Sequence, residues 1–343
     1  MKLVAVRQAH RFDEAALGTY LAKHLDGFSG PLWISQFDAG QSNPTFLLES
    51  ESASYVLRKK PPGELLPKAH MVEREYRVMA SLASTAVPVP RVLHLCEDAT
   101  IIGTPFFVME FLEGRVLSDA TLPEAKSADR ALLHEAMVAT LAALHEVDYD
   151  ALGLGDFGKP GNYFERQVSR WTRQYKAAQT DNIPSMDRLI AWLPNNAPVN
   201  DSTSLVHGDY RMDNVIFHPF EPRIIGVLDW ELSTLGHPLA DLAYYCQTYH
   251  VDTHHARLAS LAGTASGIPT EAETIASYCR HTGRTEIADW PYYMAFSMFR
   301  LAGIAQGVYK RGLDGNASSP RALEMGKKVA VLSNTAWALV ESR

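Results

Sequence analysis

Two short β-prone runs, each ending in acidic side chains, constrain the fold of this 343-residue chain more than any other feature. The first run leads into residues 207–214 (HGDYRMDN), and the second, RIIGVLDWE, ends at Asp229. Taken singly, such residues usually cap helices or close turns. Asp209, Asn214 and Asp229 together supply the oxygen ligands that Mg²⁺ prefers, and a carboxylate to lie near an incoming hydroxyl. The spacing therefore predicts a magnesium-nucleotide site.

The first third of the chain has the pattern of a small sheet with helices. Leucine and alanine recur at helical spacing over residues 13–25, and β-prone runs lie on both sides of AGQSNP and at residues 55–59. An amphipathic helix is expected over residues 69–82, followed by a buried strand in GTPFFVMEFLEG. We place one boundary near residues 110–114.

Helical patterns dominate the rest of the chain. Apolar residues recur at helical spacing over residues 130–146, 164–176, 271–282 and 290–309. Tyr244 and Tyr245, in HPLADLAYY, are interpreted as core aromatic residues.

Composition excludes several classes of partner. The chain carries 32 Lys and Arg against 39 Asp and Glu, a net charge of −7, and has no long basic run. Nucleic acids and anionic membranes both select clustered basic residues, so neither is the expected partner. Three widely spaced cysteines indicate neither a disulfide framework nor a thiolate zinc site. With no signal-peptide pattern and no apolar run long enough to span a bilayer, a cytoplasmic location is expected. The sequence indicates no oligomeric state.

The motif HGDxxxxN, followed by a strand and an aspartate, resembles that of aminoglycoside phosphotransferases and choline kinases, relatives of the protein kinases. The resemblance covers nearly the whole chain. The runs YVLRKKPPG, HGDYRMDNVIFHP, VLDWELSTLGHPLADLAYY and AGIAQGVYKR are similar to the kinase-like domain that precedes acyl-CoA dehydrogenase domains in some proteins. The resemblance implies an α+β, bilobal protein-kinase-like fold. A small antiparallel-sheet N-lobe would comprise residues 1–110, and a larger, mainly helical C-lobe residues 111–343.

The resemblance also implies roles for the residues around the motif. Asp209 would be the catalytic base or the carboxylate that orients the hydroxyl, and Asn214 and Asp229 would bind magnesium. His207 would orient the loop. Arg211 would stabilise the transferring phosphoryl group, although it could equally pair with Asp213 in solvent. Asp241, in HPLADLAYY, resembles an acid that braces the catalytic loop.

In the first lobe, Arg58 aligns with the phosphate-binding lysine of the family, and Glu75 with its ion-pair partner. Arginine is a departure from the lysine pattern. Side chains alternate along a strand, so Arg58 and Lys60 share one face and Lys59 lies on the other. Arg58 is the preferred phosphate contact and Lys59 the alternative, while Glu75 could instead belong to an exposed set of helical charges.

Two further segments would contact the nucleotide. AGQSNPTFLL resembles the phosphate-covering turn of the family, although its glycine and asparagine would also suit an ordinary hairpin. Residues 109–112 would form the hinge whose backbone meets adenine. The predicted contacts are Gly40, Ser42 and Asn43 in the turn and Met109, Glu110, Phe111 and Leu112 in the hinge.

The expected function is ATP-dependent transfer of the terminal phosphate to a hydroxyl of a small molecule, with ATP and Mg²⁺ as cofactors. No Walker A motif occurs, which disfavours a P-loop kinase. The acyl-CoA dehydrogenase resemblance favours a hydroxyacyl compound or its CoA thioester as acceptor. The alternatives are a true aminoglycoside kinase, a catalytically degenerate nucleotide-binding module, and a metal phosphoesterase that uses His207, Asp209 and Asp229. The sequence does not distinguish ATP from GTP.

Overall fold

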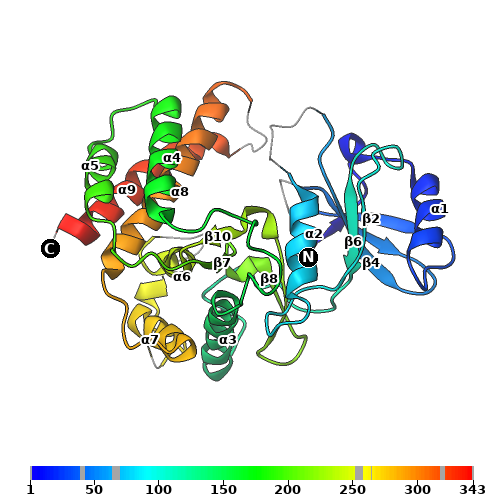
Figure 1. Ribbon diagram of the computed structural model, residues 1–343, viewed down its shortest axis with the longest axis horizontal. Helices are drawn as coiled ribbons and strands as arrows, with labels where there is room; N and C mark the ends of the chain where they lie inside the picture. The colour runs from blue at the N-terminus through cyan, green and yellow to red at the C-terminus, as the bar shows by residue number, and fades with distance from the viewer. Residues whose placement is uncertain are drawn as a thin grey trace. The chain divides into compact units, whose positions relative to one another are not determined.

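The protein folds as two compact units, described from a computed structural model (Figure 1). The first unit comprises Met1–Val116 and Asp213–Ser233, and the second Leu117–Met212 and Thr234–Arg343. The predicted α+β class is confirmed, because strands dominate the first unit and helices the second. The structure describes residues 2–38, 43–63, 70–251, 258–263, 265–316 and 321–341.

The first unit contains an antiparallel sheet of six strands in the order β1-β2-β3-β4-β6-β5. This matches the small antiparallel sheet that was expected. The strands are β1 (Leu3–Val4), β2 (Trp33–Phe37), β3 (Thr45–Glu49), β4 (Ser54–Lys59), β5 (Val92–Cys96) and β6 (Phe106–Glu110).

Two helices lie on opposite faces of this sheet (Figure 1). Helix α1 (Glu14–His24) is capped by Asp13, whose carboxylate accepts a hydrogen bond from the backbone N of Ala16. The helix buries Leu17 and Leu21 against the sheet. Helix α2 (Val72–Leu82) packs on β5 and β6. Because side chains alternate along β4, Leu57 is buried in the α1 core, whereas Arg58 faces α2.

A second, smaller hairpin completes the first unit. Strands β8 (Val215–Phe217) and β9 (Ile224–Val227) pair with each other, and Phe217 also bridges to Arg115. A Cβ added at Gly114 would lie 2.3 Å from Ile216 Cγ2, so only glycine allows this close approach. These contacts explain why Asp213–Ser233 belongs to the first unit. The expected continuous lobe of residues 1–110 does not include this segment.

The second unit is mainly helical, with β7 (Ser204–Val206) and β10 (Thr234–Gly236) as its paired strands. Helix α8 is central, packing against α4, α6 and α9. Each helix described is too short or too polar to cross a bilayer. Helix α7 has the bounds expected for it, while α5 and α9 were not anticipated. The helices are α3 (Ser127–His145), α4 (Tyr163–Ala178), α5 (Pro184–Trp192), α6 (Pro238–Cys246), α7 (Glu271–Thr282), α8 (Trp290–Leu313) and α9 (Met325–Glu341).

Candidate active site

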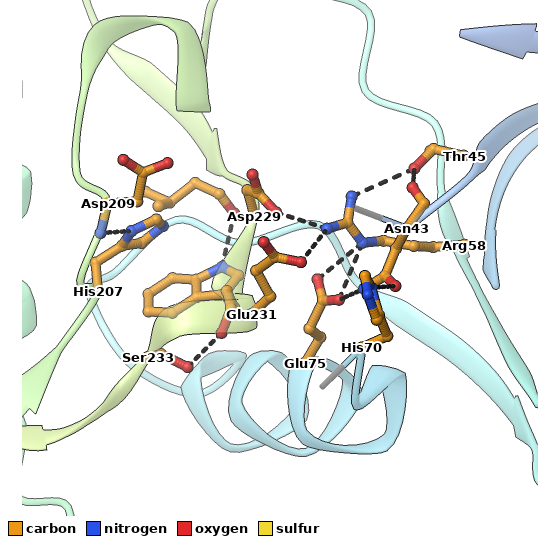
Figure 2. Close-up of polar contacts among 12 residues, drawn as sticks. Asn43, Thr45, Arg58, His70, Glu75, His207, Asp209, Asp229, Glu231 and Ser233 are labelled. Carbon is orange, nitrogen blue, oxygen red and sulfur yellow. Dashed lines mark hydrogen bonds and ion pairs between the residues drawn. The ribbon is translucent and has the colours of Figure 1, made fainter. Parts of the chain in front are cut away.

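Arg58 is the centre of an ion-pair network in the first unit (Figure 2). Its Nε lies 2.9 Å from Glu75 Oε2 on α2, so the expected ion pair is present. Its Nη2 lies 2.6 Å from Asp229 Oδ1 and 3.8 Å from Glu231 Oε2. A single guanidinium therefore links the sheet, α2 and the segment that follows β9.

Further polar side chains next to this network contact Glu75 and Arg58 (Figure 2). Asn43 Nδ2 donates a hydrogen bond of 2.8 Å to Glu75 Oε1, and His70 Nδ1 lies 3.1 Å from Asn43 Oδ1. Thr45 Oγ1 accepts a hydrogen bond of 3.3 Å from Arg58. Asn43 is 1% exposed, so its side chain supports Glu75 from within the protein. The other two predicted turn contacts, Gly40 and Ser42, lie outside the described residues.

The lysines on either side of Arg58 have different surroundings. Lys59 is buried on the opposite face of β4, with its Nζ 5.7 Å from the centroid of the Phe12 ring. Burial lowers the pKa of Lys59. Lys60 shares the face of Arg58 but pairs with Glu73 at 2.5 Å. Arg58, rather than the alternative Lys59, therefore joins the acidic network.

Negative charge exceeds positive charge among the four network residues. Burial alone would lower the pKa of Arg58, but Glu75, Asp229 and Glu231 outweigh it and raise that pKa, so Arg58 stays charged. Burial raises the pKa of Glu75, against the lowering effect of Arg58, and Asp229 raises it further. Three carboxyl groups thus lie around one guanidinium, and the accessible one, on Asp229, offers an oxygen donor of the kind that a divalent cation binds.

Asn214 and Asp229 lie at the same end of the β8–β9 hairpin. Asn214 directly precedes β8, and Asp229 is separated from the end of β9 by Leu228 alone. The backbone N of Leu228 donates a hydrogen bond of 2.8 Å to the backbone O of Asn214. Asp229 has a left-handed backbone with φ +66°, a strained conformation that aspartate tolerates better than most residues. Its side chain is 31% exposed and thus accessible.

The donors present fit a magnesium ion. Among the residues that the structure describes, no group of three or more His, Cys, Asp or Glu side chains is placed to hold a metal. Mg²⁺ needs no such cage, because it is usually bound by one or two carboxylates together with waters and substrate phosphates. Asn214 and Asp229 place one amide and one carboxylate at this hairpin end, which meets that requirement.

In the second unit, Asp241 holds the backbone of the loop that carries Asp209. Its Oδ2 accepts a hydrogen bond from His207 N at 2.5 Å, and its Oδ1 accepts one from Gly208 N at 2.9 Å. Gly208 has φ +83°, which favours glycine at this turn. Asp241 lies in the first turn of α6 and is 2% exposed. This is the geometry expected of a brace.

Asp241 keeps its charge although it is buried. Burial alone would raise its pKa, but the adjacent imidazole of His145, with His207 and the backbone N–H of Gly208, outweighs burial and lowers the pKa. His145 Nε2 lies 3.5 Å from Asp241 Oδ2. The brace is therefore an anion held by several donors.

His207 and Arg211 lie on either side of Asp209. The buried His207 ring accepts a hydrogen bond from Asp209 N through its Nδ1, at 3.2 Å (Figure 2). Arg211 Nε lies 3.5 Å from Asp209 Oδ2, and its side chain is half exposed. His207 thus contacts the loop backbone, while Arg211 lies beside the carboxylate.

The predicted hinge residues lie at the end of β6. Met109 is buried, and Glu110 Oε1 accepts a hydrogen bond of 2.8 Å from Arg91 N. Phe111 and Leu112 follow the strand. A Cβ at Gly226 would lie 2.5 Å from Leu112 Cδ1, so this segment packs closely against β9.

Three further residues contact the predicted ones: Glu231, Tyr244 and Arg300. Tyr244 donates a hydrogen bond to Asp209 Oδ1 at 2.5 Å, which differs from its interpretation as a core residue. Its position three residues after Asp241 on a helix was a usable signal, since such residues share a face. Arg300 donates to Gly208 O at 2.8 Å from α8, a contact that sequence spacing does not indicate.

Comparison with known proteins adds three findings. Residues 33–277 match the family described as "Phosphotransferase enzyme family". The chain is 48% identical over 336 residues to acyl-CoA dehydrogenase family member 10 of Mus musculus, covering 97% of this chain and 31% of that protein. It is also 46% identical over 341 residues to acyl-CoA dehydrogenase family member 11 of Pongo abelii, covering 97% of this chain and 44% of that protein. The chain thus spans less than half the length of these relatives.

Solved structures agree on the fold. A Ralstonia eutropha JMP134 protein, described as a candidate aminoglycoside phosphotransferase, has a TM-score of 0.89 at 49% identity, over 97% of this chain and 99% of its own. An aminoglycoside phosphotransferase in complex with ADP and hygromycin B has a TM-score of 0.60 at 16% identity, over 94% and 97%. The second likeness shows the fold alone. The predicted kinase-like fold is confirmed, and the chain belongs to the phosphotransferase enzyme family.

Proposed function

We propose that this chain transfers the terminal phosphoryl group of ATP to a hydroxyl of a small molecule. The observation that carries the proposal is the placement of Arg58 between Glu75 and Asp229. A cation fixed by a buried carboxylate, next to an accessible acid, is what a site for magnesium-bound phosphates requires. Two solved structures that share the fold hold ADP or an ATP analogue, which supports ATP as the donor.

The first unit would bind the nucleotide. Asn214 and Asp229 would hold Mg²⁺, which would neutralise charge on the phosphates during transfer. Arg58 would contact phosphate oxygens, and Glu75 would fix its guanidinium. The backbone of residues 109–112 would meet adenine, and the turn with Gly40 and Ser42 would cover the phosphates. Asn43 was predicted to contact the phosphates as well, but it is buried and would act through Glu75 instead.

The second unit would prepare the acceptor. Asp209 would orient the hydroxyl and take its proton as the oxygen attacks the terminal phosphorus and the bond to ADP breaks. Arg211 would stabilise the charge on the transferring group. His207 and Asp241 would keep the loop in register. Phosphoryl transfer depends mainly on such positioning and charge, so each residue acts through its geometry.

We propose a hydroxyacyl compound or its CoA thioester as the acceptor. Two relatives of this chain are named as acyl-CoA dehydrogenase family members, and the part that matches this chain is about a third to a half of each. Two arginines surround the Asp209 loop: Arg211 beside its carboxylate and Arg300 on its backbone. Positive charge there disfavours a polycationic aminoglycoside and favours an anionic acceptor.

A panel assay tests the proposal. Purified protein, Mg²⁺ and ATP are incubated with short-chain hydroxyacyl-CoA thioesters, the free hydroxy acids, kanamycin or hygromycin B, and ADP and the phosphorylated product are measured. We expect a hydroxyacyl substrate to accelerate ADP formation, and Asp209→Asn to lower that rate by roughly 10²–10⁴-fold. If only the aminoglycosides are phosphorylated, the acceptor is an aminoglycoside and the hydroxyacyl proposal is wrong.

Two other outcomes would decide against phosphoryl transfer. Nucleotide binding without any turnover above Asp209→Asn would indicate a degenerate binding module. Release of phosphate from monoesters without ATP would indicate a phosphoesterase, although the described residues show no two-metal cluster of the kind such enzymes use.

A further inference from the structure

We propose that Tyr244 is a positioning residue for Asp209, holding one oxygen of its carboxylate so that the other is presented to the acceptor hydroxyl. The inference rests on the proposed function and extends it to a residue outside the HGDxxxxN motif. The phenol of Tyr244 donates to Asp209 Oδ1 at 2.5 Å, while Oδ2 lies on the side of Arg211. The two oxygens are therefore not equivalent.

Helix α6 carries both the residue that fixes the backbone of the Asp209 loop and the residue that fixes the Asp209 side chain. Asp241 and Tyr244 are three residues apart on α6 and share a face. Asp241 fixes the backbone of His207 and Gly208, and Tyr244 fixes the side chain of the next residue, Asp209. The backbone and the carboxylate of the loop are thus set by the same rigid element, which is how a precise orientation is maintained.

Arg300 holds Tyr244 from the neighbouring helix α8. Its Nη2 donates to Gly208 O at 2.8 Å, and its guanidinium lies 5.7 Å from the centroid of the Tyr244 ring. Trp171 on α4 lies under the same guanidinium at 6.0 Å. A cation over an aromatic ring is attracted to its face, so Arg300 links the loop backbone to the ring that holds the carboxylate.

The hydrogen bond has a fixed direction. Burial raises the pKa of Tyr244, the negative charge of Asp209 raises it further, and Arg211 and Arg300 lower it less than these raise it. The phenol therefore stays protonated and donates, and the carboxylate accepts. Rotation of an aspartate carboxylate about its last bond is otherwise broad, so the hydrogen bond from Tyr244 to Oδ1 restricts the orientation of the carboxylate.

The test compares Tyr244→Phe with Tyr245→Phe. Tyr245 is the next residue on α6, but its hydroxyl contacts His134 at 3.1 Å instead of the loop, which makes it a matched control. Magnesium-dependent ADP formation is measured in the full chain with water as acceptor, so that the result does not depend on the identity of the substrate. We expect Tyr244→Phe to lower kcat by roughly 10–100-fold with KM for ATP within about twofold, and Tyr245→Phe to change neither.

A double variant shows whether the effect passes through Asp209. If Tyr244 acts on that carboxylate, adding Tyr244→Phe to Asp209→Asn causes little further loss. A loss as large as in the wild type would overturn the inference, as would an unchanged kcat in Tyr244→Phe. If Tyr244→Phe fails to fold, Arg300→Gln provides the test. We expect Arg300→Gln to lower kcat with a similar KM for ATP, and an unchanged kcat in this variant would also overturn the inference.

The two proposals fail in different ways. If Asp209→Asn lowers ADP formation and Tyr244→Phe does not, the positioning role is wrong and the proposed function stands. If Asp209→Asn leaves ADP formation unchanged, the role of Asp209 in phosphoryl transfer is wrong, and the role of Tyr244 fails with it.

Discussion

Arg58 and Asp229, 171 residues apart in the sequence, meet through a contact of 2.6 Å between Nη2 and Oδ1. The arginine points from β4 toward α2, and the aspartate follows β9 with a left-handed backbone. The contact ties the proposed phosphate contact to a proposed metal ligand. Glu75, on the other side of the guanidinium, makes the arrangement a buried network rather than a surface pair.

Replacing Arg58 with methionine is expected to lower the free energy of unfolding by about 3–5 kcal/mol, because it leaves the buried Glu75 carboxylate without its cation. Lys60→Met is the matched control. Lys60 shares the strand face but pairs with Glu73, whose side chain is 24% exposed against 1% for Glu75, so its loss should cost less, about 1 kcal/mol. Urea unfolding of the two variants measures the difference. Equal losses would show that the network adds nothing beyond an ordinary ion pair.

Asp229→Asn is expected to weaken the magnesium dependence of nucleotide binding, since an amide binds Mg²⁺ less well than a carboxylate. A titration of Mg²⁺ against binding of a fluorescent ADP analogue measures the effect, and we expect the half-saturating Mg²⁺ concentration to rise by roughly tenfold. Glu231→Gln removes a similar charge 3.8 Å from the same arginine and is the control. An unchanged Mg²⁺ requirement in Asp229→Asn would rule out its role as a ligand.

Local patterns predicted much of this site. Side chains alternate along any strand, so the sequence around Arg58 was enough to place Lys59 on the other face. Helix α7 was predicted with its observed bounds from the helical spacing of residues 271–282, and the structure adds a capping box of Thr270 and Glu273 at its first turn. The β-prone runs likewise predicted that Asp209 and Asp229 each follow a strand, and they follow β7 and β9.

Contacts set by tertiary packing were not predictable in the same way. Tyr244 has the composition of a core residue, and its hydrogen bond to Asp209 depends on how α6 packs against β7. Arg300 meets the loop only because α8 packs on α6. The grouping of Asp213–Ser233 with the first unit depends on Gly114 and Arg115 approaching β8, which no periodicity in the sequence indicates.

The free energy of unfolding should decrease as the pH is lowered below about 6.5, the ordinary pKa of histidine. Burial lowers the pKa of His134 to about 4, from an ordinary value of 6.5. As pH falls from 6.5 toward 4, the unfolded chain binds a proton that the folded chain does not, which favours unfolding. Between pH 7.5 and 5.0 this residue should cost about 2 kcal/mol.

The comparison for that prediction is His134→Gln, which keeps hydrogen-bonding groups but cannot titrate. Urea unfolding at the two pH values should show a drop smaller by about 2 kcal/mol in the variant. The buried His237, whose pKa is also lowered to about 4, contributes equally in both proteins and cancels. The same drop in both would contradict a neutral, buried His134.

The most direct test of the account is where a divalent cation binds. Crystals grown with Mn²⁺ and a non-hydrolysable ATP analogue would locate the metal by its anomalous signal. We expect a peak within bonding distance of Asn214 and Asp229 and of the analogue's phosphates. A peak bound by other side chains, or nucleotide bound without contact to either residue, would contradict it.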